Sequence, residues 1–274
     1  ASKVDATGTV YITQLNADLS LNSNFGSSGV ISFTPNSTTT PTSVFVTDMY
    51  VANDTAGDEG VIYITGYTRT SGGVNTAFTG KVASDGSGTI TEATPVSTLT
   101  ATTTSPVSGG VRQSSNGRVL VSGYDGSLGT IAAYNSEMTA IDTSFATSGY
   151  YATAIDNPIV AMTIDTLDRI YIAYKSSATV IAVVRLLENG TVVDSDFSAT
   201  FITGTAYSAT QIKMAIDLTN SQLIVAAQDG TGAANTIQLK RFALVDGTAA
   251  GNISTITVAD TVLNVSDLFI DNDS

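Results

Sequence analysis

The sequence contains a degraded internal repeat, with one copy every fifty-odd residues. Its clearest unit, LNSNFGSSG at residues 21–29, returns as IDTSFATSG at residues 141–149 and, more degraded, as VDSDFSA at residues 193–199. A fixed period of roughly 20–50 residues or slightly more is typical of solenoids, propellers and other arrays, in which each unit packs on the next. The repeat therefore limits the possible architectures, although by itself it indicates no activity.

Short apolar runs follow the same period. Four of them, rich in β-branched and aromatic residues, begin at residues 62, 119, 170 and 223 and so lie 57, 51 and 53 residues apart. Such runs predict buried strands. A second series precedes them and a third follows, separated by Asp-, Asn- and Gly-rich turns: residues 44–48, 159–164 and 212–216, then residues 77–82, 131–134, 180–184 and 237–242. With a weaker outer strand, each repeat predicts an antiparallel sheet of about four strands, which is a propeller blade.

The two ends of the chain predict the parts of one further repeat. Residues 265–271 fit a first strand, residues 2–5 a second and residues 9–15 a third. A blade shared by both termini closes a ring and removes an exposed sheet edge, whereas a solenoid needs distinct capping repeats. We therefore predict an all-β fold: a five-bladed β-propeller with four-stranded antiparallel blades, its ring closed by N- and C-terminal strands that share one blade.

The predicted propeller is one domain over residues 1–274, and a hydrophobic content of 42% is enough for a packed core. Blade 1 combines residues 262–274 with residues 1–35, and the other blades cover about 42–100 (blade 2), 106–153 (blade 3), 157–204 (blade 4) and 209–258 (blade 5).

Composition excludes several kinds of function. The chain has neither Cys nor His, so disulfides, zinc–thiolate sites, thiol nucleophiles, Ser-His-Asp triads and imidazole metal ligands are ruled out. A net charge of −13 disfavours nucleic acid and anionic membrane surfaces as partners. No apolar run reaches the roughly 20 residues of a membrane span, so we predict no membrane insertion.

The location is predicted from weaker features. A start at Ala1-Ser2 fits the residues left by signal-peptide cleavage as well as it fits an arbitrary boundary. Few Lys, no Cys and abundant Thr, Ser and Asn resemble extracellular bacterial or virion surface proteins. We predict a secreted protein or one on an extracellular surface, with its signal peptide already removed.

Residues 15–30, 134–145 and 187–197 resemble the bacterial delta-sixty repeat, whose pattern is roughly LNxDGSLDxSFGxxGxV. The second repeat keeps residues 84–87 of this pattern and loses the Phe, and the last repeat keeps only residues 245–248. The resemblance implies β-propeller-like blades in secreted or surface proteins, most of which have no assigned activity.

Two features of the repeat could form binding sites. The recurring Phe with its Asp or Asn and Gly neighbours could line one pocket per blade, but we favour a structural turn in which the Phe packs between blades. The pairs Asp271 with Asp273 and Asp165 with Asp168 are weak calcium candidates, because calcium prefers six to eight oxygens and the sequence lacks an Asp-x-Asp-x-Asp-Gly loop with a closing Glu. We therefore predict no cofactor, with calcium as the weak alternative.

Catalysis by carboxylates is also disfavoured. Some five-bladed propellers are glycosidases that use two carboxylates across a central pocket. The four Glu residues all fall outside the predicted inner strands, whereas Asp48 and Asp267 fall on them. A lone inner Asp is more often solvated or hydrogen-bonded than catalytic. We predict no catalytic residues and no enzyme.

Two hypotheses for the function follow. The first is a non-enzymatic structural or assembly protein, with protein partners or self-assembly, in which the termini complete a blade within one chain or between neighbouring chains. The alternative is a lectin-like module that binds glycans or other ligands and stacks sugars on Tyr50, Tyr67, Tyr124 or Tyr174, of which the last three recur at similar repeat positions. A glycoside hydrolase is the least favoured interpretation.

Overall fold

The computed structural model describes residues 2–4, 8–35, 43–52, 60–87, 91–92, 108–154, 156–177, 180–191, 193–197, 199–202, 212–229, 235–258, 267–268 and 270. Every regular element in these residues is a β-strand, and the strands form five antiparallel sheets. No helix in the described part of the chain is long and apolar enough to cross a membrane.

The sheets follow one another along the sequence. The first contains β1 (Ser2–Val4), β2 (Val10–Thr13) and β3 (Val30–Phe33), and the second contains β4 (Ser43–Val51), β5 (Ile62–Arg69), β6 (Asn75–Val82) and β7 (Thr91–Glu92). The third contains β8 (Gly110–Gln113), β9 (Val119–Tyr124), β10 (Gly129–Tyr134) and β11 (Tyr150–Ala152). The fourth contains β12 (Ile159–Ile164), β13 (Ile170–Ser177), β14 (Val180–Leu186) and β15 (Ala199–Ile202). The fifth contains β16 (Ile212–Asp217), β17 (Gln222–Asp229), β18 (Asn235–Ala243) and β19 (Ala249–Val258).

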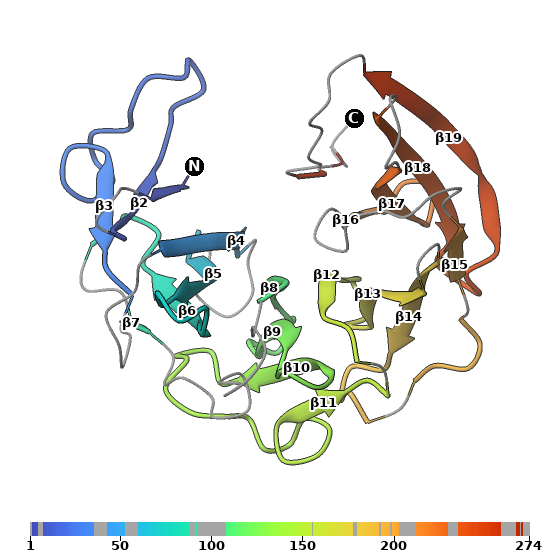
Figure 1. Ribbon diagram of the computed structural model, residues 1–274. Helices are drawn as coiled ribbons and strands as arrows, with labels where there is room; N and C mark the ends of the chain where they lie inside the picture. The colour runs from blue at the N-terminus through green and yellow to red at the C-terminus, as the bar shows by residue number, and fades with distance from the viewer. Residues whose placement is uncertain are drawn as a thin grey trace.

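The five sheets stand around a common centre (Figure 1). In the last four sheets each strand pairs with its neighbour in sequence, and β4, β8, β12 and β16 form the inner edges (Figure 1). These inner strands contact one another in order around the centre, and β1 contacts β4. The chain is therefore all-β with a propeller-like arrangement of antiparallel sheets, as the repeat predicts.

The first sheet differs from the other four. It has three strands, of which β1 and β2 lie where the second and third strands of this blade are predicted. The predicted first strand falls mostly outside the described residues, and residues 267, 268 and 270 do not lie in a strand. The first and fifth sheets stand on either side of the two termini (Figure 1), so closure of the ring remains a prediction.

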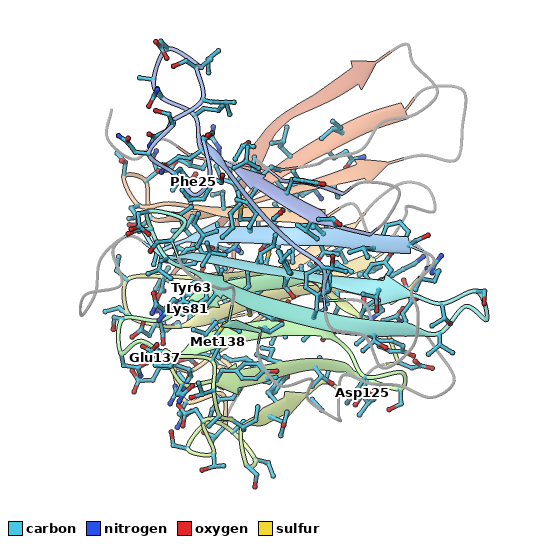
Figure 2. All side chains as sticks on the ribbon, turned by 90° about the vertical axis from the view of Figure 1, so that its left-hand side faces the viewer. Phe25, Tyr63, Lys81, Asp125, Glu137 and Met138 are labelled. Carbon is cyan, nitrogen blue, oxygen red and sulfur yellow. The ribbon has the colours of Figure 1, made fainter. Side chains whose placement is uncertain are left out.

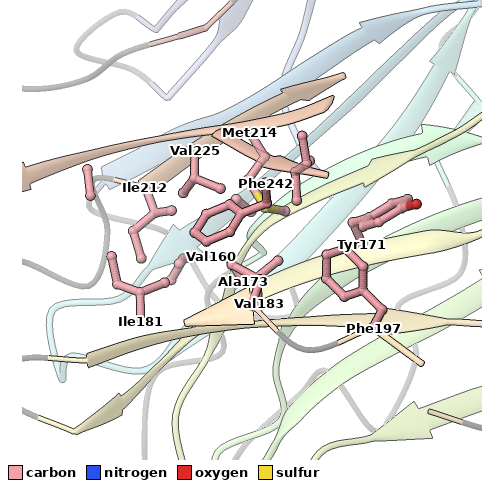
Figure 3. Close-up of a cluster of buried hydrophobic side chains, with 14 of the residues drawn as sticks. Val160, Tyr171, Ala173, Ile181, Val183, Phe197, Ile212, Met214, Val225 and Phe242 are labelled. Carbon is pink, nitrogen blue, oxygen red and sulfur yellow. The ribbon is translucent and has the colours of Figure 1, made fainter. Parts of the chain in front are cut away.

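The hydrophobic core is divided into four clusters, and each lies between two consecutive sheets. Figure 3 shows the cluster between the fourth and fifth sheets, in which Tyr171 and Val183 meet Met214 and Phe242. Burying each such side chain contributes about 1.5–3 kcal/mol. We call each contact region between consecutive sheets a joint, and the four clusters make four joints.

The pleat of the strands decides which side chains reach a joint, because successive side chains point to opposite faces of a sheet. The second residues of β5, β9 and β13 face the following sheet. These residues are Tyr63, Leu120 and Tyr171, and each belongs to the cluster that its own sheet shares with the following sheet. Their cross-strand partners on the next strand are Lys81, Ala133 and Arg185. These partners therefore point toward the following sheet as well.

Candidate functional site

A cavity of about 490 Å³ opens where the inner edges of the sheets meet. It lies where the inner strands end, because its walls come from Tyr50 on β4, Arg112 on β8, and the ends of β12 and β16 with the turns that follow. Leu268 and Ile270 complete the wall beside the fifth sheet. The concave shape and the polar groups make this cavity the first place to look for chemistry.

The inner-strand carboxylate predicted from sequence is already paired. One oxygen of Asp48 lies 2.5 Å from Nη1 of Arg112 and also accepts a hydrogen bond from the Val111 amide at 3.1 Å. This contact joins the second sheet to the third. Asp267 lies in the described C-terminal segment but outside any strand, and its carboxylate accepts a hydrogen bond from the amide of Leu268.

The carboxylate of Asp165 also serves the protein itself. It accepts hydrogen bonds from Nε of Arg169 at 2.6 Å, from the Tyr171 hydroxyl at 3.0 Å, and from the amides of Leu167 and Arg169. Burial raises the pKa of Tyr171 to about 12, so this hydroxyl keeps its proton at neutral pH and remains a donor.

Asp168 links two sheets through its carboxylate. It accepts hydrogen bonds from the amide of Ser115 at 2.7 Å and from the Ser115 hydroxyl, so the turn after β12 is tied to the turn after β8. The oxygens of Asp165 and Asp168 are thus used by protein donors rather than arranged around an ion. No group of three or more His, Cys, Asp or Glu residues within the described ranges could hold a metal. Asp271 and Asp273 lie outside those ranges.

Of the candidate stacking tyrosines, Tyr50 lines the central cavity, whereas Tyr67, Tyr124 and Tyr174 lie in three different sheets and do not line it. Tyr67 stacks on Phe45 with ring centroids 4.7 Å apart, and the guanidinium of Arg69 lies over both rings. The hydroxyl of Tyr124 donates to Asp156, and Tyr174 is half-buried, with a pKa raised by burial. The structure therefore does not gather the three into one site.

The recurring Phe belongs to a turn at a joint, which we call a Phe turn (residues 21–29, 141–149 and 193–197). Phe25, Phe145 and Phe197 are buried in clusters shared with the following sheet. In each turn the Asn or Asp three residues earlier accepts a hydrogen bond from the amide two residues after it, at 3.0–3.1 Å. The structural interpretation of the repeat motif therefore holds at these three places.

Two Phe turns also bond directly to the next sheet. The amide of Gly26, directly after Phe25, donates to the carbonyl of Asp85 at 2.8 Å. The amide of Ala146, directly after Phe145, donates to the carbonyl of Asn189 at 2.7 Å. The residues after Asp85 and Asn189 are Gly86 and Gly190, and the lack of a side chain there leaves space for the Phe ring of the turn. A Cβ added at Gly190 would lie 2.2 Å from Cζ of Phe145, and one at Gly86 would lie 2.9 Å from the ring of Phe25.

Two arginines, which sequence reasoning missed, fasten the Phe turns. Nε of Arg118 lies 2.6 Å from Asp142, its guanidinium lies 5.4 Å from the ring centroid of Phe145, and Nη1 donates to the carbonyl of Glu188 in the next sheet at 3.0 Å. Arg185 does the same in the fourth sheet.

Nη2 of Arg185 lies 2.6 Å from Asp194, and its guanidinium lies 4.9 Å from the ring centroid of Phe197. Nη1 donates to the carbonyls of Leu244 and Val245 in the fifth sheet. Charge-assisted hydrogen bonds of this kind are stronger than neutral ones. The two arginines come from different places, before β9 and within β14, so the repeat period alone does not align them.

No family model matches the sequence, and no curated protein matches it. Among solved structures, a similar chain is that of a β-xylosidase, titled RS223-Beta-xylosidase. The two chains share 13% sequence identity at a TM-score of 0.42, and the match covers 77% of this chain and 79% of that chain.

Proposed function

We propose that this protein is a non-enzymatic structural subunit of an extracellular assembly. The observation that carries the proposal is the use of the acidic residues Asp165 and Asp168, which line the central cavity, and of Asp48, which pairs with the lining residue Arg112. Asp48, Asp165 and Asp168 each accept hydrogen bonds from the protein itself, and two of these contacts join neighbouring sheets. A glycosidase needs one protonated acid and one free carboxylate on opposite sides of its substrate. The acidic residues here support architecture better than acid–base chemistry.

The proposal includes five blades with the predicted boundaries, in which the C-terminal strand of one copy completes the blade of the N-terminal strands of a neighbouring copy. Two observations support it. Among the described strands, β1 lies at an edge of its sheet, where another strand could pair with it. Leu268 and Ile270 line the cavity beside Met214 and Ile216 of β16, which is where the inner strand of the following blade belongs.

The extracellular location is part of the same proposal and rests on composition. A Cys-free, Thr- and Ser-rich chain with a net charge of −13 suits a soluble surface exposed to the medium. Its partners are other copies of itself or other proteins of the assembly.

Light scattering after size exclusion tests the assembly role. We expect masses that are multiples of 28.1 kDa and grow with concentration. A mass of 28.1 kDa at every concentration up to the millimolar range would contradict self-assembly. Release of the dye from chromogenic aryl glycosides, β-xylosides included, would contradict the non-enzymatic role.

The alternative is glycan binding, and one contact favours it. Phe45 is 38% exposed and stacks on Tyr67 beneath Arg69, so an aromatic surface with an adjacent cation faces solvent. Aromatic faces of this kind bind apolar faces of ligands. Array signals that disappear in Tyr67→Ala, without loss of stability, would favour this function. Tyr124→Ala, in a sheet without such a stack among the described contacts, serves as the comparison.

A further inference from the structure

Leu19 in the first sheet and Met138 in the third hold the same position in their repeats. Each ends a turn in which its amide donates to the carbonyl of an Asn three residues earlier at 2.9 Å, from Leu19 to Asn16 and from Met138 to Asn135. Each has a left-handed backbone, with φ of +67° and +56°. In three other blades a glycine, Gly86, Gly190 or Gly247, has the positive φ of this turn.

The two residues differ in what covers them. A left-handed conformation costs an L-residue about 1–2 kcal/mol, so a large side chain there needs a compensating contact. Met138 is 0% exposed in the cluster that the second and third sheets share, whereas Leu19 is 77% exposed. Leu15 and Leu21, which flank the same turn, are 46% and 50% exposed. The first sheet thus presents an apolar surface where the third sheet is covered.

The contact that buries Met138 in the third sheet shows which elements can pack on such an apolar surface. Tyr63 and Lys81 of the second sheet lie over the turn of Met138 (Figure 2). Nζ of Lys81 donates to the carbonyl of Ser136 at 3.1 Å and pairs with Glu137 at 3.2 Å. The second and third strands of the preceding blade, β5 and β6, therefore pack on this turn, and Lys81 supplies a cation that pairs with the carboxylate of Glu137.

The fifth sheet carries the matching pair of positions. In the register of its strands, Ile224 opposes Arg241 as Tyr63 opposes Lys81 and Tyr171 opposes Arg185. Lys81 and Arg185 both reach the carbonyls of the next sheet, whereas Nε of Arg241 is buried without a hydrogen-bond partner among the described residues, and its guanidinium acts electrostatically on Asp217 of its own sheet. On the first sheet, Asp18 stands where Glu137 stands on the third. Arg241 and Asp18 are therefore complementary in charge and position.

We propose that the fifth sheet of one copy docks on the first sheet of a second copy, with Arg241 paired to Asp18 and Leu19 buried in the contact. The four joints within a chain are packed clusters of buried side chains, and the described strands of its first and fifth sheets stand apart (Figure 1). Packed cores resist the rearrangement that would bring these two sheets together. The contact is head-to-tail, so it propagates from copy to copy or closes a larger ring. This docking proposal rests on the proposed assembly function and identifies the interface between copies.

A charge exchange between two variants tests this contact. Asp18→Arg alone and Arg241→Asp alone each place like charges in every interface, and we expect each to raise the dissociation constant of the assembly at least about tenfold. An equal mixture of the two variants restores an opposite pair at every contact between unlike copies, so the wild-type mass should return in light scattering. Glu188→Arg is the control, because it reverses a charge on the same kind of turn in the fourth sheet, where the preceding sheet is in place.

A crosslink supplies a measurement that does not depend on loss of assembly. Since the chain has no Cys, Asp18→Cys with Arg241→Cys gives the only two thiols, and a short bis-maleimide should link separate chains into a ladder. Lys81→Cys with Glu137→Cys is the control and should link within one chain, because these side chains meet inside it at 3.2 Å.

The outcomes separate the two proposals. A crosslink confined to single chains, or a mixture that stays dissociated, overturns the docking between copies. An assembly whose mass Asp18→Arg leaves unchanged overturns this interface but keeps the assembly function. A wild-type protein that is monomeric at every concentration overturns both.

Discussion

Gly190 shows how one residue can limit the packing of two sheets. It has φ of +68°, and a Cβ there would lie 2.2 Å from the ring of Phe145, which is fully buried beneath Arg118. We expect Gly190→Ala to lower the free energy of unfolding by about 2–4 kcal/mol, because backbone strain adds to overpacking. Gly73→Ala is the control: its φ is +80°, nothing lies within 4 Å of the added Cβ, and about 1 kcal/mol of strain alone is expected.

Urea unfolding of the two variants measures this difference. Equal losses for Gly190→Ala and Gly73→Ala would show that the ring of Phe145 moves aside at no cost. The difference between the variants isolates the joint, since both glycines have positive φ and differ in what surrounds them.

Residue roles at the joints could be predicted only in part from the sequence. The three recurring Phe residues are visible by alignment, and their burial was expected. Arg118 and Arg185 could not be aligned, because the same guanidinium position is reached from before β9 in one blade and from β14 in another. The exposure of Leu19 could not be foreseen either, since Met138 at the same repeat position is covered by a neighbouring sheet.

The Phe turn is the element that connects one sheet to the next. In the turn at residues 141–149, the carboxylate of Asp142 accepts a hydrogen bond from the amide of Ser144 and pairs with Arg118. The ring of Phe145 packs in the joint between the third and fourth sheets. We expect Phe145→Ala to destabilise the protein by about 3–5 kcal/mol, because it removes a fully buried ring and leaves a cavity. Phe45→Ala, at a stacked but partly exposed ring, should cost about 1 kcal/mol.

Chemical denaturation distinguishes these cases, and the slope of the transition adds information. If Phe145→Ala also lowers the slope of the unfolding free energy against denaturant concentration, this joint has separated and the sheets on its two sides unfold independently. A loss below about 1 kcal/mol for Phe145→Ala would contradict the role of the Phe turn.

Strands were predictable where burial on both faces makes a continuous apolar run. β5, β9 and β13 begin at residues 62, 119 and 170, where the runs begin, and β17 begins one residue before its run. The inner strand of the third sheet, β8, was not predicted, because its sequence GVRQ has one large apolar residue. The long β19 was expected only as a weaker outer strand, since an outer strand needs less apolar sequence than an inner one.

Two of the four joints contain ionised carboxylates, Asp142 and Asp194, and these groups contribute to the response of the whole molecule to acid. Burial raises the pKa of Asp142 and Asp194, but the hydrogen bonds from Ser144 and Arg118 to the first, and from Arg185 to the second, lower it more, so both pKa values lie below the ordinary one. Below about pH 3.9 the unfolded chain therefore binds more protons than the folded chain, and the stability from these contacts is lost as pH falls through the folded pKa values.

We expect the free energy of unfolding to be nearly constant between about pH 5.5 and 7.5, since the chain has no His, and to fall steeply below about pH 4. Asp142→Asn and Asp194→Asn should each lower stability at neutral pH and flatten the acid limb, because the group that titrates is gone. Glu188→Gln, on an exposed turn, is the control and should leave the profile unchanged. Thermal unfolding across this range measures the profile. A loss of stability centred between pH 5 and 7, or an acid limb unchanged in both Asp variants, would show that other groups govern the response to acid.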